Sequence, residues 1–140
     1  MREILFRGKT AVTGRWIEGL LWEKKYNSNK IFISYFPDKD DNEDALVVDP
    51  KTVGQFTGLT DKNGVKIFEN DVVFVTDDNG CSGQVDTGVG EIDFLEGLWY
   101  ISGNVQNSLY DIDKCFQIEV IGNIFDNPEL LEGGGSNETD

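Results

Sequence analysis

The sequence predicts a mainly β (β-rich α+β) fold, in which a smaller β lobe precedes a compact strand-rich domain that ends in a short helix. Apolar and polar residues alternate in most segments, which is typical of half-buried strands. Clusters of Gly and Asn separate these segments, as turns between strands require. Only one helix start is well marked, at Asn127. We place the lobe at residues 1–50, the domain at 51–132 and a disordered tail at 133–140.

The N-terminal lobe is expected to hold four short strands, at residues 4–6, 16–22, 31–36 and 46–48. These stretches are rich in apolar, β-branched and aromatic residues, which favour strands. In the second of them Trp16, Glu18, Leu20 and Trp22 share one parity, so they lie on one face of the strand. The acidic segment 38–44 has no periodicity and is predicted to be an exposed loop.

The domain is expected to hold strands at residues 52–56, 72–75, 92–94, 98–101 and 116–122, with 83–90 as a loop or weak strand. Gly58 is expected to break the first strand. Asn63-Gly64 and Asn79-Gly80 predict tight turns, because Asn-Gly supplies positive φ angles, and Glu96-Gly97 is expected to join a hairpin.

A C-terminal helix is predicted where Asn127 can cap, Pro128 suits the first helical position and Glu129 favours the positive end of the dipole. The three glycines at 133–135 are expected to end it. A second short helix is expected at 111–115.

Composition excludes several classes of function. The 140 residues contain 26 Asp+Glu against 12 Lys+Arg, a net charge of −14, and no histidine. Histidine-dependent triads, metal sites and pH switches are therefore excluded. The chain lacks the broad basic surface of non-specific nucleic-acid binders, and anionic membranes should repel it. No signal peptide or transmembrane span fits, so we expect a cytoplasmic protein.

The two cysteines, Cys81 and Cys115, are too few for a zinc site. One disulfide between them stays an alternative to two free thiols, which a reducing cytosol favours.

Two segments resemble the YopX family of small bacteriophage and prophage proteins. Residues 55–73 read QFTGLTDKNGVKIFENDVV and are similar to its central signature, and residues 119–131 read EVIGNIFDNPELL and are similar to its C-terminal signature. Residues 2–8 also fit the start of that family. The resemblance implies an SH3-like β-barrel core and no established activity.

One residue departs from the family pattern. Asn70 stands where the family more often has Gly before an Asp-Val-Val strand. Because Asn tolerates the left-handed backbone region second only to Gly, we expect the turn to be retained, with Asp71 accepting backbone amides there.

The acidic motifs are interpreted as structural. Asp38, Asp40, Asn42 and Asp44, followed by Asp49, have the spacing of a calcium loop, but Glu43 stands where that loop requires Gly. A solvated loop is therefore favoured, and the same holds for residues 77–80. The carboxylates of Glu91 and Asp93 share one strand face, as an acid–base pair or a solvent-facing edge would.

The glycines and aromatic residues are likewise interpreted as structural. Gly83, Gly88 and Gly90 lack the lysine and the strand–helix context of a phosphate-binding loop. The larger aromatic side chains are expected in the core or between lobes rather than on a ligand platform: Trp16, Trp22, Phe74, Trp99, Tyr100 and Phe116. We name no catalytic, metal-binding or cofactor-binding residue and no cofactor, and the binding residues stay unknown.

Two functional hypotheses follow. The first is a phage or prophage accessory protein that is not an enzyme and binds proteins: a host or phage protein, or its own copies through exposed β edges. The alternative is an acidic mimic of nucleic acid that occupies a host DNA-binding protein. Direct DNA binding is disfavoured, because the cluster Lys24, Lys25 and Lys30 is diluted by the acids of 38–44.

The net charge is interpreted as scattered surface charge that keeps a small barrel soluble. Residues 38–44 together with Glu138 and Asp140 carry −6 of this net charge. We therefore expect the folded domain itself to be less negatively charged than the total suggests.

Overall fold

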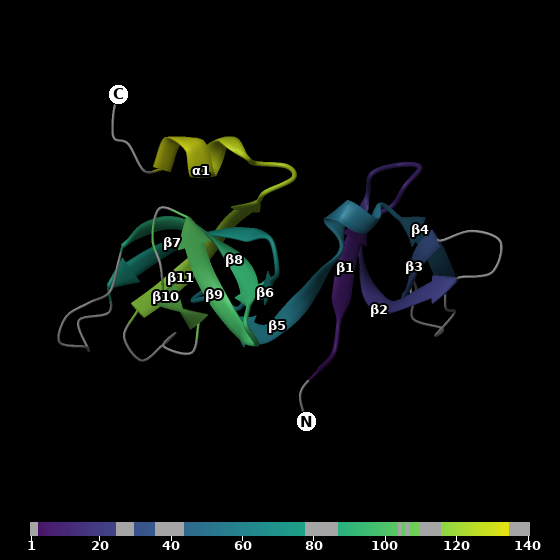
Figure 1. The fold of residues 1–140 in the computed structure, drawn as a ribbon, viewed down its shortest axis with the longest axis horizontal. Helices are drawn as coiled ribbons and strands as arrows, with labels where there is room; N and C mark the ends of the chain where they lie inside the picture. Colours follow the sequence, from purple (N-terminus) through teal and green to yellow (C-terminus); the bar gives the residue numbers. More distant parts are fainter. Residues whose placement is uncertain are drawn as a thin grey trace. The chain divides into compact units, whose positions relative to one another are not determined.

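The computed structural model describes residues 3–24, 30–35, 44–77, 87–103, 105, 107–109 and 116–134. The chain divides into two units, Met1–Gly58 and Leu59–Asp140 (Figure 1). Several predicted features lie outside the described residues: the loop 38–43, the turn at 79–80, both cysteines, the helix at 111–115 and the tail from 135.

The first unit is built from antiparallel strands in the order β4-β3-β2-β1-β5, and β6 of the second unit follows β5 in the same sheet. Their bounds are β1 (Phe6–Lys9), β2 (Trp16–Lys24), β3 (Lys30–Tyr35), β4 (Asp44–Val48) and β5 (Gly54–Thr60). A short 3₁₀ helix, η1 (Pro50–Thr52), precedes β5, and Asp49 caps it.

The end of β1 also meets β4. Thr10 forms a β-bridge with Val48, and the Ala11 N–H donates to the Val47 carbonyl at 2.9 Å. Strands β1 to β4 thereby close around a small core of Ile17, Ile33 and Val48.

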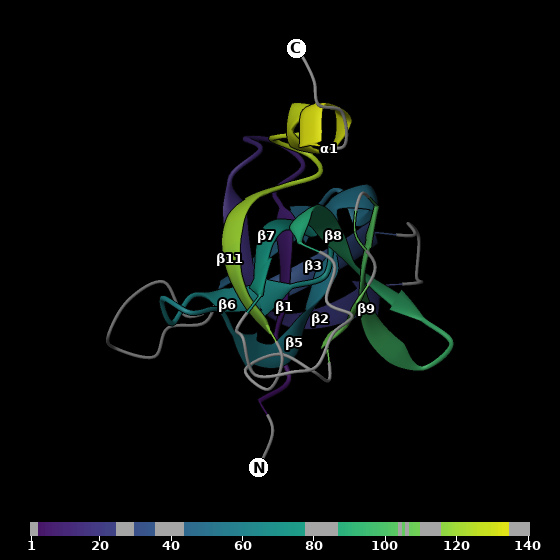
Figure 2. The ribbon, with the colours of Figure 1, turned by 90° about the vertical axis from the view of Figure 1, so that its left-hand side faces the viewer.

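The second unit contains β6 (Lys66–Phe68), β7 (Asp71–Asp77), β8 (Gly88–Leu95), β9 (Leu98–Gly103), β10 (Asn107–Ser108), β11 (Phe116–Asn123) and α1 (Glu129–Gly134). Its sheet has the order β10-β9-β8-β7-β11, in which the last strand returns to pair with β7 (Figure 2). This is the strand order of an SH3-like core. The mainly β fold with a short C-terminal helix is confirmed.

The core of the second unit lies on one face of this sheet. On β11 the alternate residues Phe116 and Ile118 are buried in this core, as the alternating pattern predicts. On β7 Val73 and Val75 belong to the same core, but Val72 is buried as well and, of residues 71–76, only Phe74 is exposed. The helix α1 packs against β8.

Local turn chemistry is confirmed where the structure describes it. Asn70 has φ 77°, and Glu96 and Gly97 have φ 52° and 83°, which is the left-handed conformation that a two-residue hairpin turn needs. Asp71 is buried, and its Oδ2 accepts the Phe68 N–H at 2.7 Å. Asn70 thus replaces Gly without loss of the turn.

Several predicted boundaries are wrong. The first strand begins at Phe6 rather than residue 4, and β8 is a full strand from Gly88. Gly58 does not break β5, because glycine adopts φ 89° there and the strand continues to Thr60. Thr52 belongs to η1 instead of a strand, and α1 extends to Gly134.

The division between the units falls inside β5. The sequence prediction places it after residue 50, next to the proline. In the structure Gly54 and Gln55 pair with Arg7 and Phe6 of β1, so the start of β5 belongs to the first unit.

The Asn127 side chain has a different role from the predicted helix cap. Its Oδ1 accepts the Asn123 N–H at 3.3 Å, next to the β-bulge of β11 between Val120 and Gly122. A β-carbon at Gly122 would collide with the Asn127 side chain, so glycine is required at this bulge.

Candidate functional site

The first unit presents an apolar, aromatic surface on the side of its sheet opposite the core, which we call the outer face. The predicted shared parity puts Leu20 and Trp22 of β2 there, 56% and 41% exposed. Trp22 stacks on its cross-strand partner Phe32, with ring centroids 4.4 Å apart. Its Nε1–H donates to Ser34 Oγ at 2.7 Å. These contacts orient the indole while part of it stays accessible.

Two cations flank the same face. The guanidinium of Arg7 lies 4.8 Å, and the ammonium of Lys9 5.5 Å, from the ring centroid of Trp16. Cation–π attraction of this kind holds positive charge close to an aromatic surface. The outer face therefore combines apolar contact area with the charges of Arg7, Lys9 and Glu18, the last of which is the cross-strand partner of Arg7.

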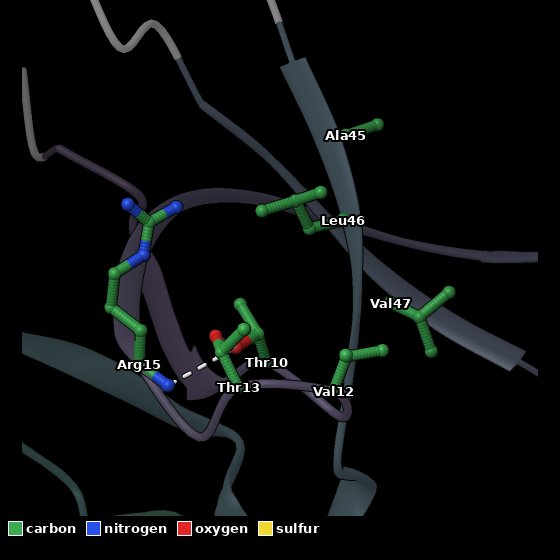
Figure 3. A pocket seen from close by; sticks show the side chains of 7 residues that line it. All are labelled: Thr10, Val12, Thr13, Arg15, Ala45, Leu46 and Val47. Carbon is green, nitrogen blue, oxygen red and sulfur yellow. Dashed lines mark hydrogen bonds between the residues drawn. The ribbon is translucent and has the colours of Figure 1, made fainter.

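A pocket of about 630 Å³ lies at the edge of β4 and is called the turn pocket (Figure 3). It is lined by Thr10, Val12, Thr13 and Arg15 of the turn that joins β1 to β2, and by Ala45, Leu46 and Val47 of β4. Apart from Arg15 and the two threonine hydroxyls, its lining side chains are aliphatic. A concave, mostly apolar site with a few polar groups is the usual form of a ligand pocket.

Hydrogen bonds hold the turn in place. The hydroxyls of Thr10 and Thr13 are 2.6 Å apart, and the Arg15 N–H donates to Thr10 Oγ1 at 3.1 Å. The Gly14 N–H donates to the Thr10 carbonyl at 2.9 Å. The polar side of the turn pocket is thus ordered by contacts within the turn.

A second pocket, the sheet pocket, has a volume of about 530 Å³ and is lined by Leu20, Leu21, Trp22, Ser34 and Ala45. Ala45 lines both pockets. The two hollows therefore adjoin, and together they connect the outer face with the edge of β4.

The residues of this site are only partly those that sequence reasoning singles out. Phe116 is buried in the core and Trp99 packs against it, as predicted. Trp22 and Phe74 are each 41% exposed, so neither of them lies in a core. The shared parity of residues in β2 indicates the outer face from the sequence. No local sequence pattern indicates that residues 10–15 lie next to β4.

The paired carboxylates Glu91 and Asp93 lie on β8. Burial, and secondly the neighbouring Asp93 carboxylate, raise the pKa of Glu91 above its ordinary value. Neither side chain lines the turn pocket or the sheet pocket. Both residues are half-buried on one face of β8, as sequence parity predicts.

The other candidate residues that the structure describes have structural roles. Asp49 Oδ1 accepts the Lys51 N–H of η1 at 3.1 Å. Gly90 lies in a strand, where a β-carbon would press on Ile101. In the described part of the chain no group of three or more Asp, Glu, Cys or His is placed to hold a metal ion. No helix there is long and apolar enough to cross a bilayer.

Charge is divided unevenly between the units. Residues 1–58 contain nine Lys and Arg and nine Asp and Glu, whereas residues 59–140 contain three and 17. The entire net charge of −14 therefore belongs to the second unit. The predicted domain at 51–132 contains four Lys and 15 Asp and Glu, a net charge of −11, so its charge is only slightly smaller than that of the whole chain.

The chain is a small β protein of two units, and its first unit has an aromatic outer face and no net charge. A family model described as "YopX protein" matches residues 5–132. The chain belongs to the YopX family, as the two signatures indicate. No curated protein matches the chain.

Two solved structures share the fold. Protein EF1440 from Enterococcus faecalis is 23% identical, with a TM-score of 0.51, and the match covers 94% of this chain and 99% of that chain. Protein yopX from Bacillus subtilis is 17% identical, with a TM-score of 0.55, and the match covers 95% and 98%. At these identities the likeness concerns the fold alone.

Proposed function

We propose that the chain is a phage or prophage accessory protein that acts as a non-enzymatic, protein-binding module in the cytoplasm, with the outer face of its first unit as the contact surface. The observation that carries the proposal is the exposure of Leu20 and Trp22 beside the cations over Trp16. Exposed aromatic and apolar side chains rimmed by charge are typical of protein interaction sites. The partner is a host or phage protein, or a further copy of the chain.

Substitution of Leu20 tests this proposal. Leu20→Ser should lower the amount of a stoichiometric partner captured from bacterial lysate at least tenfold, because burying a leucine side chain at an interface contributes about 1.5–3 kcal/mol. The measurement is quantitative mass spectrometry of proteins retained by the immobilised full chain.

The matched control is Leu98→Ser in the second unit. Leu98 is 55% exposed, against 56% for Leu20, so both variants remove the same exposed side chain. The control should retain the partner. Equal capture by both variants, or the absence of a stoichiometric partner with the unsubstituted chain, would contradict the proposal.

The acidic mimic is a second candidate, supported by the concentration of net charge in residues 59–140. A strongly acidic surface competes with nucleic acid for basic sites, and salt screens that attraction. The chain should then displace labelled duplex DNA from bacterial RNA polymerase at about 50 mM salt and fail to do so at several-fold higher salt. Undiminished DNA binding at low salt rules this candidate out for that enzyme.

A further inference from the structure

The two adjoining pockets follow the edge of β4, and the turn pocket lies at the end where the turn between β1 and β2 meets this strand. The turn is joined to that strand by the Ala11 N–H donating to the Val47 carbonyl and by the bridge between Thr10 and Val48. An extended segment that enters over Ala45 from the sheet pocket meets this junction, where the Val47 carbonyl already accepts the Ala11 N–H. A segment that ends at the junction can place its terminal residue in the turn pocket.

The chemistry of the pocket matches a chain terminus. In Figure 3 the Arg15 side chain lies on one side of the pocket and the side chains of Leu46 and Val47 lie across from it, with Thr10, Thr13 and Val12 below. A C-terminal residue carries a carboxylate and its side chain on the same Cα atom. An aliphatic C-terminal residue can thus offer a carboxylate to the guanidinium and an apolar group to the valine and leucine side chains.

We propose that the turn pocket binds the free C-terminus of a partner protein that ends in a branched aliphatic residue such as leucine. This proposal rests on the protein-binding function above and names the part of the partner that is recognised. Arg15 is the carboxylate-binding residue, through charge-assisted hydrogen bonds. Arg15 has another interaction within the chain, and the five N–H donors of a guanidinium allow it to make both.

The dimensions agree with this ligand. The pocket is open to solvent, since Val12 is 93% exposed, and its volume of about 630 Å³ leaves room for more than one side chain. Residues that precede the terminus would pass Ala45, which lines both pockets. They would then contact Leu20 and Trp22 in the sheet pocket.

The test uses N-acetyl-leucine as a probe of the terminus, titrated into the ¹⁵N-labelled full chain and followed by NMR. Saturable shifts should occur at Val12, Leu46 and Val47, with a dissociation constant in about the millimolar range that a fragment of this size reaches. N-acetyl-leucinamide, which lacks the carboxylate, should bind at least fivefold more weakly. N-acetyl-aspartate, which lacks the aliphatic group, should also bind at least fivefold more weakly.

Two variants test whether Arg15 causes the difference in binding between the acid and the amide. Arg15→Gln should remove the difference between the acid and the amide, whereas Lys51→Gln, which removes an exposed cation elsewhere in the same unit, should preserve it. Two peptides distinguish a terminal carboxylate from a side-chain carboxylate. Acetyl-Gly-Gly-Leu, which has a free C-terminus, should bind, and acetyl-Gly-Asp-Leu-Gly-amide, whose carboxylate belongs to an aspartate side chain, should not.

Each contrary result has a definite meaning. Equal binding of acid and amide, shifts confined to other residues, or the same shifts with inorganic phosphate would overturn the C-terminus proposal. If these occur while capture of a lysate partner still depends on Leu20, the protein-binding function stands with a different ligand chemistry. If the probe binds as expected but Leu20→Ser retains every partner, the proposed contact surface fails instead.

Discussion

The variant Asp61→Asn is expected to lower the free energy of unfolding by about 3 kcal/mol. Asp61 is buried, and its Oδ1 accepts the N–H groups of Asn63 at 2.8 Å and Val65 at 2.9 Å. Its Oδ2 accepts the Val120 N–H at 2.9 Å. An asparagine amide group would face at least one of these donors with another donor and leave a buried N–H without an acceptor.

Urea denaturation of the full chain, followed by circular dichroism, measures this loss. The control is Glu132→Gln on α1, an exposed position, where removal of one negative charge should change stability by less than about 0.5 kcal/mol. If both variants are equally stable, the three hydrogen bonds do not stabilise the fold as argued.

The contribution of Asp61 should also depend on pH. Burial by itself raises the pKa of this carboxyl, but the amides of Val120, Val65 and Asn63, together with the Lys62 ammonium, outweigh it and lower the pKa below the ordinary value. The stabilisation is therefore fully present above the unfolded pKa of about 3.9. It is lost as pH falls through the lower pKa of the folded state.

The difference in stability between the unsubstituted chain and Asp61→Asn should accordingly be constant above about pH 5 and shrink at lower pH. Glu91, whose raised pKa acts in the opposite direction, is present in both proteins and cancels in the difference. A difference that stays constant down to about pH 2 would show that the charge of Asp61 does not stabilise the fold.

The variant Gly19→Ala is expected to destabilise the first unit by about 3 kcal/mol. Gly19 pairs with Phe6 of β1, and the next residue, Leu20, pairs with Ser34 of β3. A β-carbon on Gly19 would overlap the carbonyl oxygen of Ser34 and lie 3.1 Å from Ile33 Cγ2. Because the obstacle is backbone, β2 and β3 must separate to accommodate it.

Gly14→Ala in the same unit is the matched control. Gly14 has φ +70°, and a β-carbon added there would have no atom within 4 Å, so alanine adds only backbone strain of about 1–2 kcal/mol. The two variants are compared by the urea dependence of tryptophan fluorescence. Equal losses would mean that the close approach of Gly19 to β3 does not limit stability.

The sequence predicts features that depend on neighbouring residues. The positive φ angles at Asn70, Glu96 and Gly97 follow from the residue types that tolerate them, and the alternation of Phe116 and Ile118 places β11 correctly. The predicted strand break at Gly58 is wrong, because a glycine can adopt a left-handed backbone conformation within a strand that continues beyond it.

The candidate site depends on contacts distant in sequence. Residues 10–15 and 45–47 form one pocket because the end of β1 bridges to β4, and no local pattern encodes that pairing. The exposure of Trp22 also depends on distant contacts. A tryptophan in an alternating strand is compatible with either face of the sheet, and the positions of the other strands decide which face is buried.

Composition, strand periodicity and turn residues were sufficient for the mainly β class, the family signatures and the exclusion of histidine chemistry, because each depends on residue identity or on neighbours along the chain. The buried acceptor role of Asp61 toward Val120, the paired pockets at Ala45 and the assignment of all net charge to the second unit required the tertiary structure. Each of these depends on strand pairing or on the boundary within β5, and those are decided by packing between residues far apart in sequence.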